Sequence, residues 1–148
     1  MIKIALLSLT FLVGAFAVDK DKASYVGGTA NLPANTEGQL LTSGGTEAVF
    51  TYKGGQLTIP YKNIKSIEYG QKAGRRIGVA IMVSPIALLS KKRKHYLTLG
   101  YADAANASQG VVIELGKDVV RSTLTALEAR SGKKVEYESE DARKNVGN

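Results

Sequence analysis

The sequence of 148 residues contains no cysteine, no tryptophan, three prolines and one histidine, His95. Without cysteine the chain can form no disulfide, no thiolate metal site and no lipid-modified cysteine. The lone histidine follows four basic residues and has no acidic neighbour in the sequence, so neither a metal site nor a Ser-His pair has a second partner there. The sequence therefore predicts a non-catalytic protein that needs no cofactor and no metal, with a fold held together by its core.

The N-terminus carries the pattern of an export signal. Met1 to Lys3 is a short basic region, and an apolar stretch from Ile4 to Phe16 follows it. Ala15-Phe16-Ala17 then provides the small-x-small motif that signal peptidases cleave. The alternative is an uncleaved membrane anchor, but a span needs about 20 apolar residues and this stretch is shorter. We expect residues 1–17 to be a signal peptide and the protein to be exported, either periplasmic or secreted.

The remainder reads as one mainly β domain over residues 23–137, followed by a polar tail over 138–148 that we expect to be frayed. Seven Tyr, 16 Gly and many β-branched residues favour strands. Gly54-Gly55 is expected to be the two-residue turn of a hairpin, with positive φ angles. Alternating apolar and polar residues predict about seven strands: Ala23 to Leu32, Gly38 to Thr42, the two arms of a hairpin over Thr46 to Tyr61, Asn63 to Gly70, His95 to Ala102, and Gly110 to Leu115.

One amphipathic helix is expected after the last long strand. Asp118 is its expected N-cap and Ser131-Gly132 its stop signal. Val119, Val120, Leu124 and Leu127 recur at helical spacing between these ends. Only a short strand, in "KKVEYE", is expected to follow, so this helix is better placed to cap the open end of a bent antiparallel sheet than to cross between parallel strands.

Two stretches give the chain a resemblance to a known family. They are "YKGGQLTIPYKNIKSIEYG", Tyr52 to Gly70, and "ELGKDVVRSTLTALEARSGKKV", Glu114 to Val135. With them the chain resembles the bacterial pleckstrin-homology-like domains of the GRAM-like kind. The resemblance implies a bent antiparallel barrel of about seven strands capped by a C-terminal helix. It does not imply inositol-phosphate binding, because Tyr25 to Thr42 holds none of the bases that such members place on their first two strands.

An apolar insertion over residues 72–95, between two of the middle strands, is not part of that family's basic fold. The stretch "GRRIGVAIMVSPIALLSKKRKHY", Gly74 to Tyr96, covers most of it, and in this stretch Ile77 to Leu89 carry no charge. No acid lies between positions 72 and 94, whereas the rest of the mature chain has 12 bases and 13 acids. Seven bases flank the apolar run: Lys72, Arg75, Arg76, Lys91, Lys92, Arg93 and Lys94.

The apolar run is too short to cross a membrane. As a helix its 13 residues would be about 20 Å long, against a hydrocarbon core of roughly 30 Å, and Pro85 would kink it. Ala, Met and Leu in its second half favour a kinked helix or a helical hairpin. The alternation of Ile77, Val79, Ile81 and Val83 leaves a strand reading open.

Three uses of the insertion compete: packing on the chain's own barrel, self-association or binding of another protein, and insertion into one membrane leaflet. The bases favour the membrane, because each contributes about 1 kcal/mol near anionic lipid. An exported protein seldom meets nucleic acid, so we do not expect that partner. We expect the seven bases to bind anionic lipid and these apolar residues to contact the membrane: Ile77, Val79, Ile81, Met82, Val83, Ile86, Leu88 and Leu89. The alternative is an oligomeric scaffold, such as a homo-oligomer, or a protein-binding module that uses the same patch.

Overall fold

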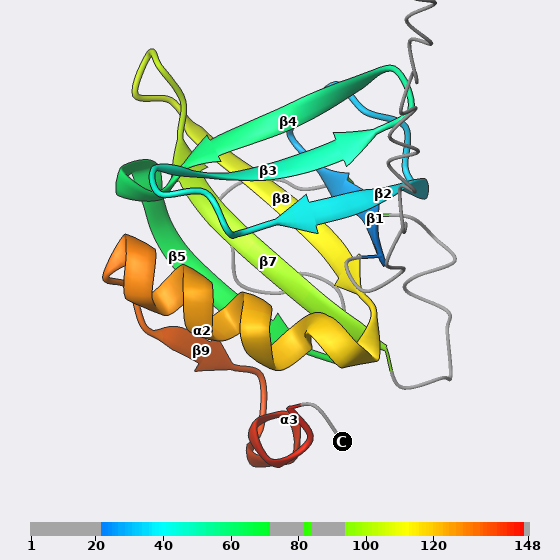
Figure 1. The fold of residues 1–148 in the computed structure, drawn as a ribbon, viewed down its shortest axis with the longest axis vertical. Helices are drawn as coiled ribbons and strands as arrows, with labels where there is room; N and C mark the ends of the chain where they lie inside the picture. Colours follow the sequence, from blue (N-terminus) through cyan, green and yellow to red (C-terminus); the bar gives the residue numbers. More distant parts are fainter. Residues whose placement is uncertain (1–21, 72–81, 84–93, 147–148) are drawn as a thin grey trace, which may run out of the picture.

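The computed structural model describes residues 22–71, 82–83 and 94–146. One sheet dominates it, with strand order β4-β3-β2-β1-β8-β7-β5-β9 and the two-residue strand β6 attached to β1 (Figure 1). The elements are β1 Lys22–Gly28, β2 Thr36–Leu41, β3 Glu47–Tyr52, β4 Gly55–Pro60, η2 Tyr61–Asn63, β5 Ile64–Gly70, β6 Met82–Val83, β7 His95–Ala102, β8 Ser108–Leu115, η3 Lys117–Val119, α2 Val120–Ser131, β9 Val135–Tyr137 and α3 Glu140–Lys144.

The seven long strands lie where the alternation of side chains predicts them, and the fold is mainly β with a helix after the last of them. The hairpin of β3 and β4 shows the local reason. Ala48 and Phe50 of β3 and Ile59 of β4 are buried, while the residues between them are less buried. Tyr52 pairs with Gly55, so the two turn residues are Lys53 and Gly54. The expected turn at Gly54-Gly55 is therefore wrong by one position, and only Gly54 has a positive φ, of 104°.

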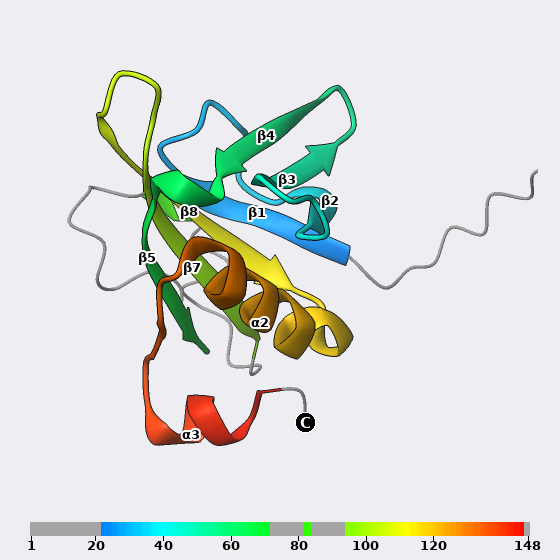
Figure 2. The same ribbon diagram turned by 60° about the vertical axis from the view of Figure 1, so that its left-hand side comes forward.

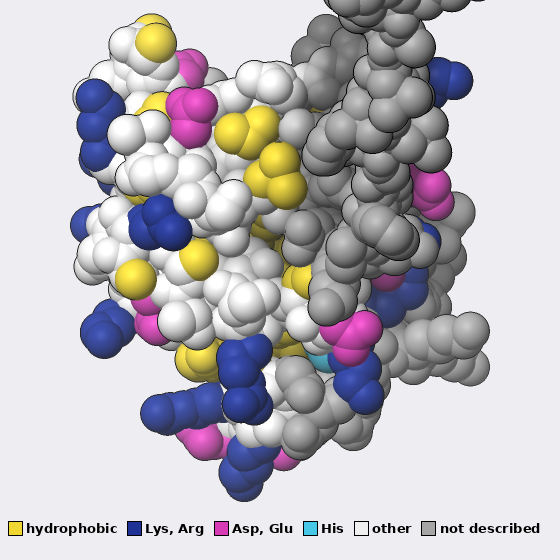
Figure 3. All heavy atoms as spheres, in the orientation of Figure 1, with side chains coloured by type: hydrophobic (Ala, Val, Ile, Leu, Met, Phe, Trp, Pro, Cys, Tyr) yellow, Lys and Arg dark blue, Asp and Glu magenta, His cyan; other side chains and the backbone are white. Residues whose placement is uncertain are grey.

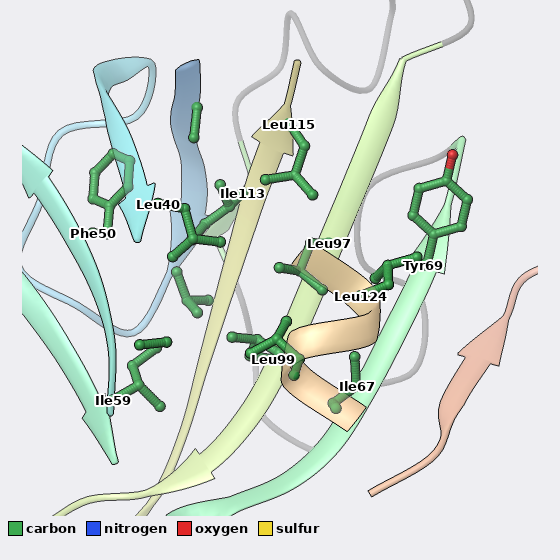
Figure 4. Packing of buried hydrophobic residues seen from close by; sticks show 14 of the residues in the cluster. Leu40, Phe50, Ile59, Ile67, Tyr69, Leu97, Leu99, Ile113, Leu115 and Leu124 are labelled. Carbon is green, nitrogen blue, oxygen red and sulfur yellow. The ribbon is translucent and has the colours of Figure 1, made fainter. Parts of the chain in front are cut away.

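The core lies between the curved sheet and α2. Figure 4 shows side chains from both halves of the sheet, such as Phe50 and Ile59 on one side and Ile67 and Leu97 on the other, in one cluster that also contains Leu124 of the helix. Leu127, one turn further along α2, is fully buried in the same cluster. Burial of such side chains stabilises the fold by roughly 1.5–3 kcal/mol each.

The helix α2 differs from the expectation at its start and agrees with it at its end. Asp118 is not the N-cap, because Lys117–Val119 form a 3-10 turn and α2 begins after it, with Val119 at the N-cap and no side-chain cap. Gly132 ends the helix in the left-handed conformation, with φ 72°. Arg130, in the last turn, donates to the carbonyl oxygen of Gly44 at 2.5 Å and lies 5.8 Å from the ring centre of Tyr61. These contacts hold the end of α2 against the β2–β3 loop and η2.

The sheet is bent but not closed, since β4 at one end and β9 at the other have no further described neighbour (Figure 2). Every pair in it is antiparallel except β5 with β9, which is parallel. The tail is more ordered than expected. Ser139 caps α3 by accepting a hydrogen bond from the Ala142 N–H, and Ala142 is buried in the core cluster, so this short helix packs instead of fraying.

Of residues 72–93, which make up most of the insertion, only Met82 and Val83 belong to the described residues. They form β6, in which Val83 pairs with Gly27 and Met82 with Gly28. At these two positions the helical expectation is wrong. The physical reason lies in β1, whose pairing with β2 stops at Tyr25, so that the next residues have an edge free to accept another strand.

Candidate functional site

The predicted membrane-contacting residues fall almost wholly outside the described residues. Met82 and Val83 are placed by their backbone in β6, and Lys94 is placed with its side chain. The other expected contacts lie outside the described part of the chain: Ile77, Val79, Ile81, Ile86, Leu88, Leu89, Lys72, Arg75, Arg76, Lys91, Lys92 and Arg93.

The described strands fix where the insertion leaves and re-enters the fold. β5 and β7 are antiparallel neighbours, and Gly70 at the end of β5 is the register partner of Tyr96 near the start of β7. The chain positions next to Lys72 and Arg93 therefore lie side by side at one end of the sheet. The two ends of the insertion, which are far apart in sequence, are therefore attached to adjacent strands.

Lys94 is already engaged within the fold. Its ammonium group donates to Glu114 Oε2 on β8 at 3.0 Å, and both side chains are about 30% exposed. The hydrogen bond to Glu114 raises the pKa of Lys94 above its ordinary value. The sequence gives no direct signal of this pair, because its members are 20 residues apart and meet only through the register of β7 with β8.

Two contacts hold the end of β5 and β7. The Tyr69 hydroxyl and His95 Nδ1 lie 2.6 Å apart, and their rings are stacked with centres 6.1 Å apart. The N–H of Gln71 donates to Glu138 Oε2 at 2.8 Å, which ties the last described residue before the insertion to the segment that precedes α3. A side chain at Gly70 would lie 2.7 Å from Cβ of Glu138, so glycine lets the two segments approach. The ends of β5 and β7, from which the insertion extends, are thus fixed by side-chain hydrogen bonds.

The described surface has neither an apolar patch nor a strong charge of its own. Leu41 is the one large hydrophobic side chain that is exposed among the described residues. The same residues carry 12 Lys and Arg against 11 Asp and Glu. On the face that carries α2, basic and acidic side chains are interspersed (Figure 3). The described residues therefore form no strongly basic surface.

A cleft of about 510 Å³ opens where β1, β2 and the end of β8 meet. Its polar lining includes Lys22, Ser24, Glu37 and Glu114. The Ser24 hydroxyl points to the carbonyl oxygen of Thr36 at 3.5 Å, and Glu114 is bonded to Lys94, so neither forms a nucleophile–base pair within the described cleft.

The described ranges 22–71, 82–83 and 94–146 contain no cluster of three His, Asp or Glu residues able to hold a metal ion. Within the same ranges, no helix has the length and apolar character needed to cross a bilayer.

Comparisons with known proteins give no identification. No protein-family model matches the chain, and no curated protein matches it.

Proposed function

We propose that this chain is an exported, non-catalytic, pleckstrin-homology-like module that docks on an anionic membrane surface through Ile77 to Leu89 and the bases on either side. The strand order β4-β3-β2-β1-β8-β7-β5 supports the likeness, because two antiparallel meanders, β1-β2-β3-β4 and β5-β7-β8, are joined by the pairing of β1 with β8 and are followed by a helix that packs on the core. The domain itself has no exposed apolar patch among its described residues.

The register of Gly70 with Tyr96 carries the proposal. It places the two attachment points of the insertion on neighbouring strands, although the apolar run separates the two basic groups in the sequence. Like charges that are held near one another repel, and an anionic partner removes this repulsion. Anionic lipid provides such a partner, while the apolar run enters the boundary between head groups and acyl chains.

The test is flotation of the protein with two kinds of vesicle, one of phosphatidylcholine alone and one containing phosphatidylglycerol. We expect binding to the anionic vesicles, weakening as salt rises because the attraction of exposed charges is screened. The triple variant Lys91→Ser, Lys92→Ser, Arg93→Ser should lose that binding. Its matched control, Lys62→Ser, Lys65→Ser, Lys133→Ser, has the same net charge and changes exposed bases elsewhere, so it should bind like the wild type.

Equal losses in the two triple variants would mean that net charge alone attracts the vesicles. A protein that ignores both kinds of vesicle but changes its size on gel filtration when Leu88→Asp is introduced would be an oligomeric scaffold. Either result would overturn membrane docking through the insertion.

A further inference from the structure

The sheet has a second buried face, on the side away from α2. Along β7, Leu97, Leu99 and Tyr101 belong to the core cluster, so the residues between them point to the opposite side. On β8, Val111, Ile113 and Leu115 face the core in the same way. We call the opposite side the outer face; it lies behind the sheet in the view of Figure 1 and is made by Val26, Tyr96, Thr98, Gly100, Gly110 and Val112.

The outer face is as inaccessible as the core. Val112 has 0% of its surface exposed, Val26 1%, Tyr96 2% and Thr98 3%. None of these side chains is a member of the core cluster formed by the described residues. A sheet face that looked into water would keep its side chains partly exposed. This face must therefore be covered by something other than the core.

The outer face has a shape on which another segment of chain can pack closely. Gly100 on β7 and Gly110 on β8 are register partners and both are buried, and buried Gly27 of β1 pairs with Val112. Glycine in a strand leaves a shallow floor on which another backbone can lie close. Two carboxylates stand on the same face, Glu114 beside Tyr96 and Glu68 beside Thr98, which gives an apolar floor with acidic margins.

We propose that the outer face is the docking site of this chain's own residues 72–93. The two residues of that segment that the structure describes are already held at one corner of it, since Val83 pairs with Gly27 and Met82 with Gly28. The ends of the segment lie at the opposite corner, where Gly70 pairs with Tyr96. A chain that runs from one corner to the other must cross β7 and β8, and their core side is filled by α2 and the buried cluster.

The lengths agree with this path. Three strand spacings separate β6 from β7 and four separate it from β5, and three residues along a strand are added to each, so the distances are about 18 Å and about 22 Å. Residues 72–81 lead to β6 and residues 84–93 lead back, and ten residues span about 15 Å as a helix and about 33 Å when extended. β5 and β7 themselves, as antiparallel neighbours, could be joined by a turn of only a few residues.

The charges and the apolar character of the segment also fit. The segment has basic residues at both ends and the outer face has acidic margins, where Lys94, the base that follows the segment, is bonded to Glu114. Residues 1–21, the other long stretch outside the described residues, join the sheet at Lys22, at the end of β1 away from β6, whereas two residues of the insertion are described and pair with β1. This is packing of the insertion on the chain's own sheet, the first of the three uses considered above. It would commit only the side chains that contact the outer face, so it does not depend on membrane docking.

The test uses the absence of native cysteine, because each double variant then holds a single cysteine pair. Thr98→Cys on the outer face is combined with Ala80→Cys or with Ala87→Cys. The control replaces Thr98→Cys by Gln56→Cys, at an exposed position of β4. After oxidation of the dilute protein without lipid, peptide mass spectrometry should find a disulfide within one chain for at least one Thr98→Cys pair and none for the Gln56→Cys pairs.

A disulfide between two chains would assign the outer face to a second copy and overturn the proposal. The absence of any disulfide would also overturn it.

A second measurement does not need cysteine. The melting temperature should fall much more for Val112→Ala than for Val49→Ala, which lies on half-buried β3, and it should not change with protein concentration. A melting temperature that rises with concentration would again indicate a second copy. Neither measurement involves lipid, so membrane docking and this site can fail separately.

Discussion

The Tyr69 hydroxyl lies 2.6 Å from Nδ1 of His95, which joins the end of β5 to the start of β7 where the insertion begins and ends. Burial raises the pKa of Tyr69, so its hydroxyl keeps its proton at neutral pH. Tyr96, one residue further along β7, is in the opposite situation, because its buried hydroxyl has no hydrogen-bond partner among the described residues.

Removing these two hydroxyl groups should have opposite effects on stability. Tyr69→Phe leaves Nδ1 of the half-buried His95 without its partner, and we expect a loss of about 1–2 kcal/mol in the free energy of unfolding. Tyr96→Phe removes a polar group whose burial has no compensating bond, so the stability should stay the same or rise. Urea denaturation of both variants measures the difference. A larger loss for Tyr96→Phe would mean that its hydroxyl has a partner outside the described residues.

The stability of the protein should fall below neutral pH because of His95. Burial, and then the charge of Lys117, lower its pKa below the ordinary 6.5, while Glu114 acts in the other direction. As the pH falls, the unfolded chain binds this proton first. The stabilisation is therefore complete above about pH 6.5 and is lost as the pH falls through the lowered pKa of the folded state.

His95 is the only histidine of the chain, so one ring signal in a proton NMR titration reports its pKa directly. We expect a midpoint below 6.5 in the folded protein. In His95→Gln, the dependence of the urea midpoint on pH between about 7 and 5 should become flatter. A folded midpoint above 6.5 would show that Glu114 outweighs burial and Lys117.

The helix α2 should be required for the stability of the sheet. Leu127 is fully buried between α2 and the strands, whereas Thr125 is exposed on the same helix. Leu127→Ala should cost about 2–5 kcal/mol, since it leaves a cavity, and Thr125→Ala should change stability by less than about 0.5 kcal/mol. Denaturation curves compare the two. Similar small effects would mean that α2 does not close the core.

Much of the fold could be predicted from the sequence because its strands alternate. Phe50 and Ile59 mark the inner side of one hairpin, and Val119 to Leu127 repeat at helical spacing, so the elements follow from local patterns. The starting residue of α2 could not be found in this way, because Asp118 has the chemistry of an N-cap but lies in a 3-10 turn. The helix α3 has only five residues and depends on burial of Ala142, which no periodicity reveals.

The geometry around the insertion could not be predicted from the sequence, for a different reason. Tyr96, Thr98 and Gly100 alternate with Leu97 and Leu99 as the water-facing side of a strand would, yet both sides of β7 are buried. A pattern of period two identifies two faces but does not say what lies on the second. The pair of Lys94 with Glu114 is likewise a product of strand register, which one-dimensional spacing does not give.

The ion pair of Lys94 with Glu114 leads to a prediction that separates two kinds of base in the insertion, those paired within the fold and those that bind lipid. Lys94 already satisfies its charge on Glu114, so it should add little to binding of anionic vesicles. Lys94→Ser should therefore float with phosphatidylglycerol vesicles almost as the wild type does, and it should lower the free energy of unfolding by at most about 1 kcal/mol, as expected for a partly exposed ion pair. Arg93→Ser, one residue earlier, changes the net charge equally and should weaken vesicle binding by roughly fivefold, the effect of one cation worth about 1 kcal/mol near anionic lipid. The comparison is made in the same buffer at two salt concentrations, where the difference should shrink as salt rises. Equal losses of vesicle binding in the two variants would mean that Lys94 leaves Glu114 for the lipid, and a loss in Lys94→Ser alone would contradict the division.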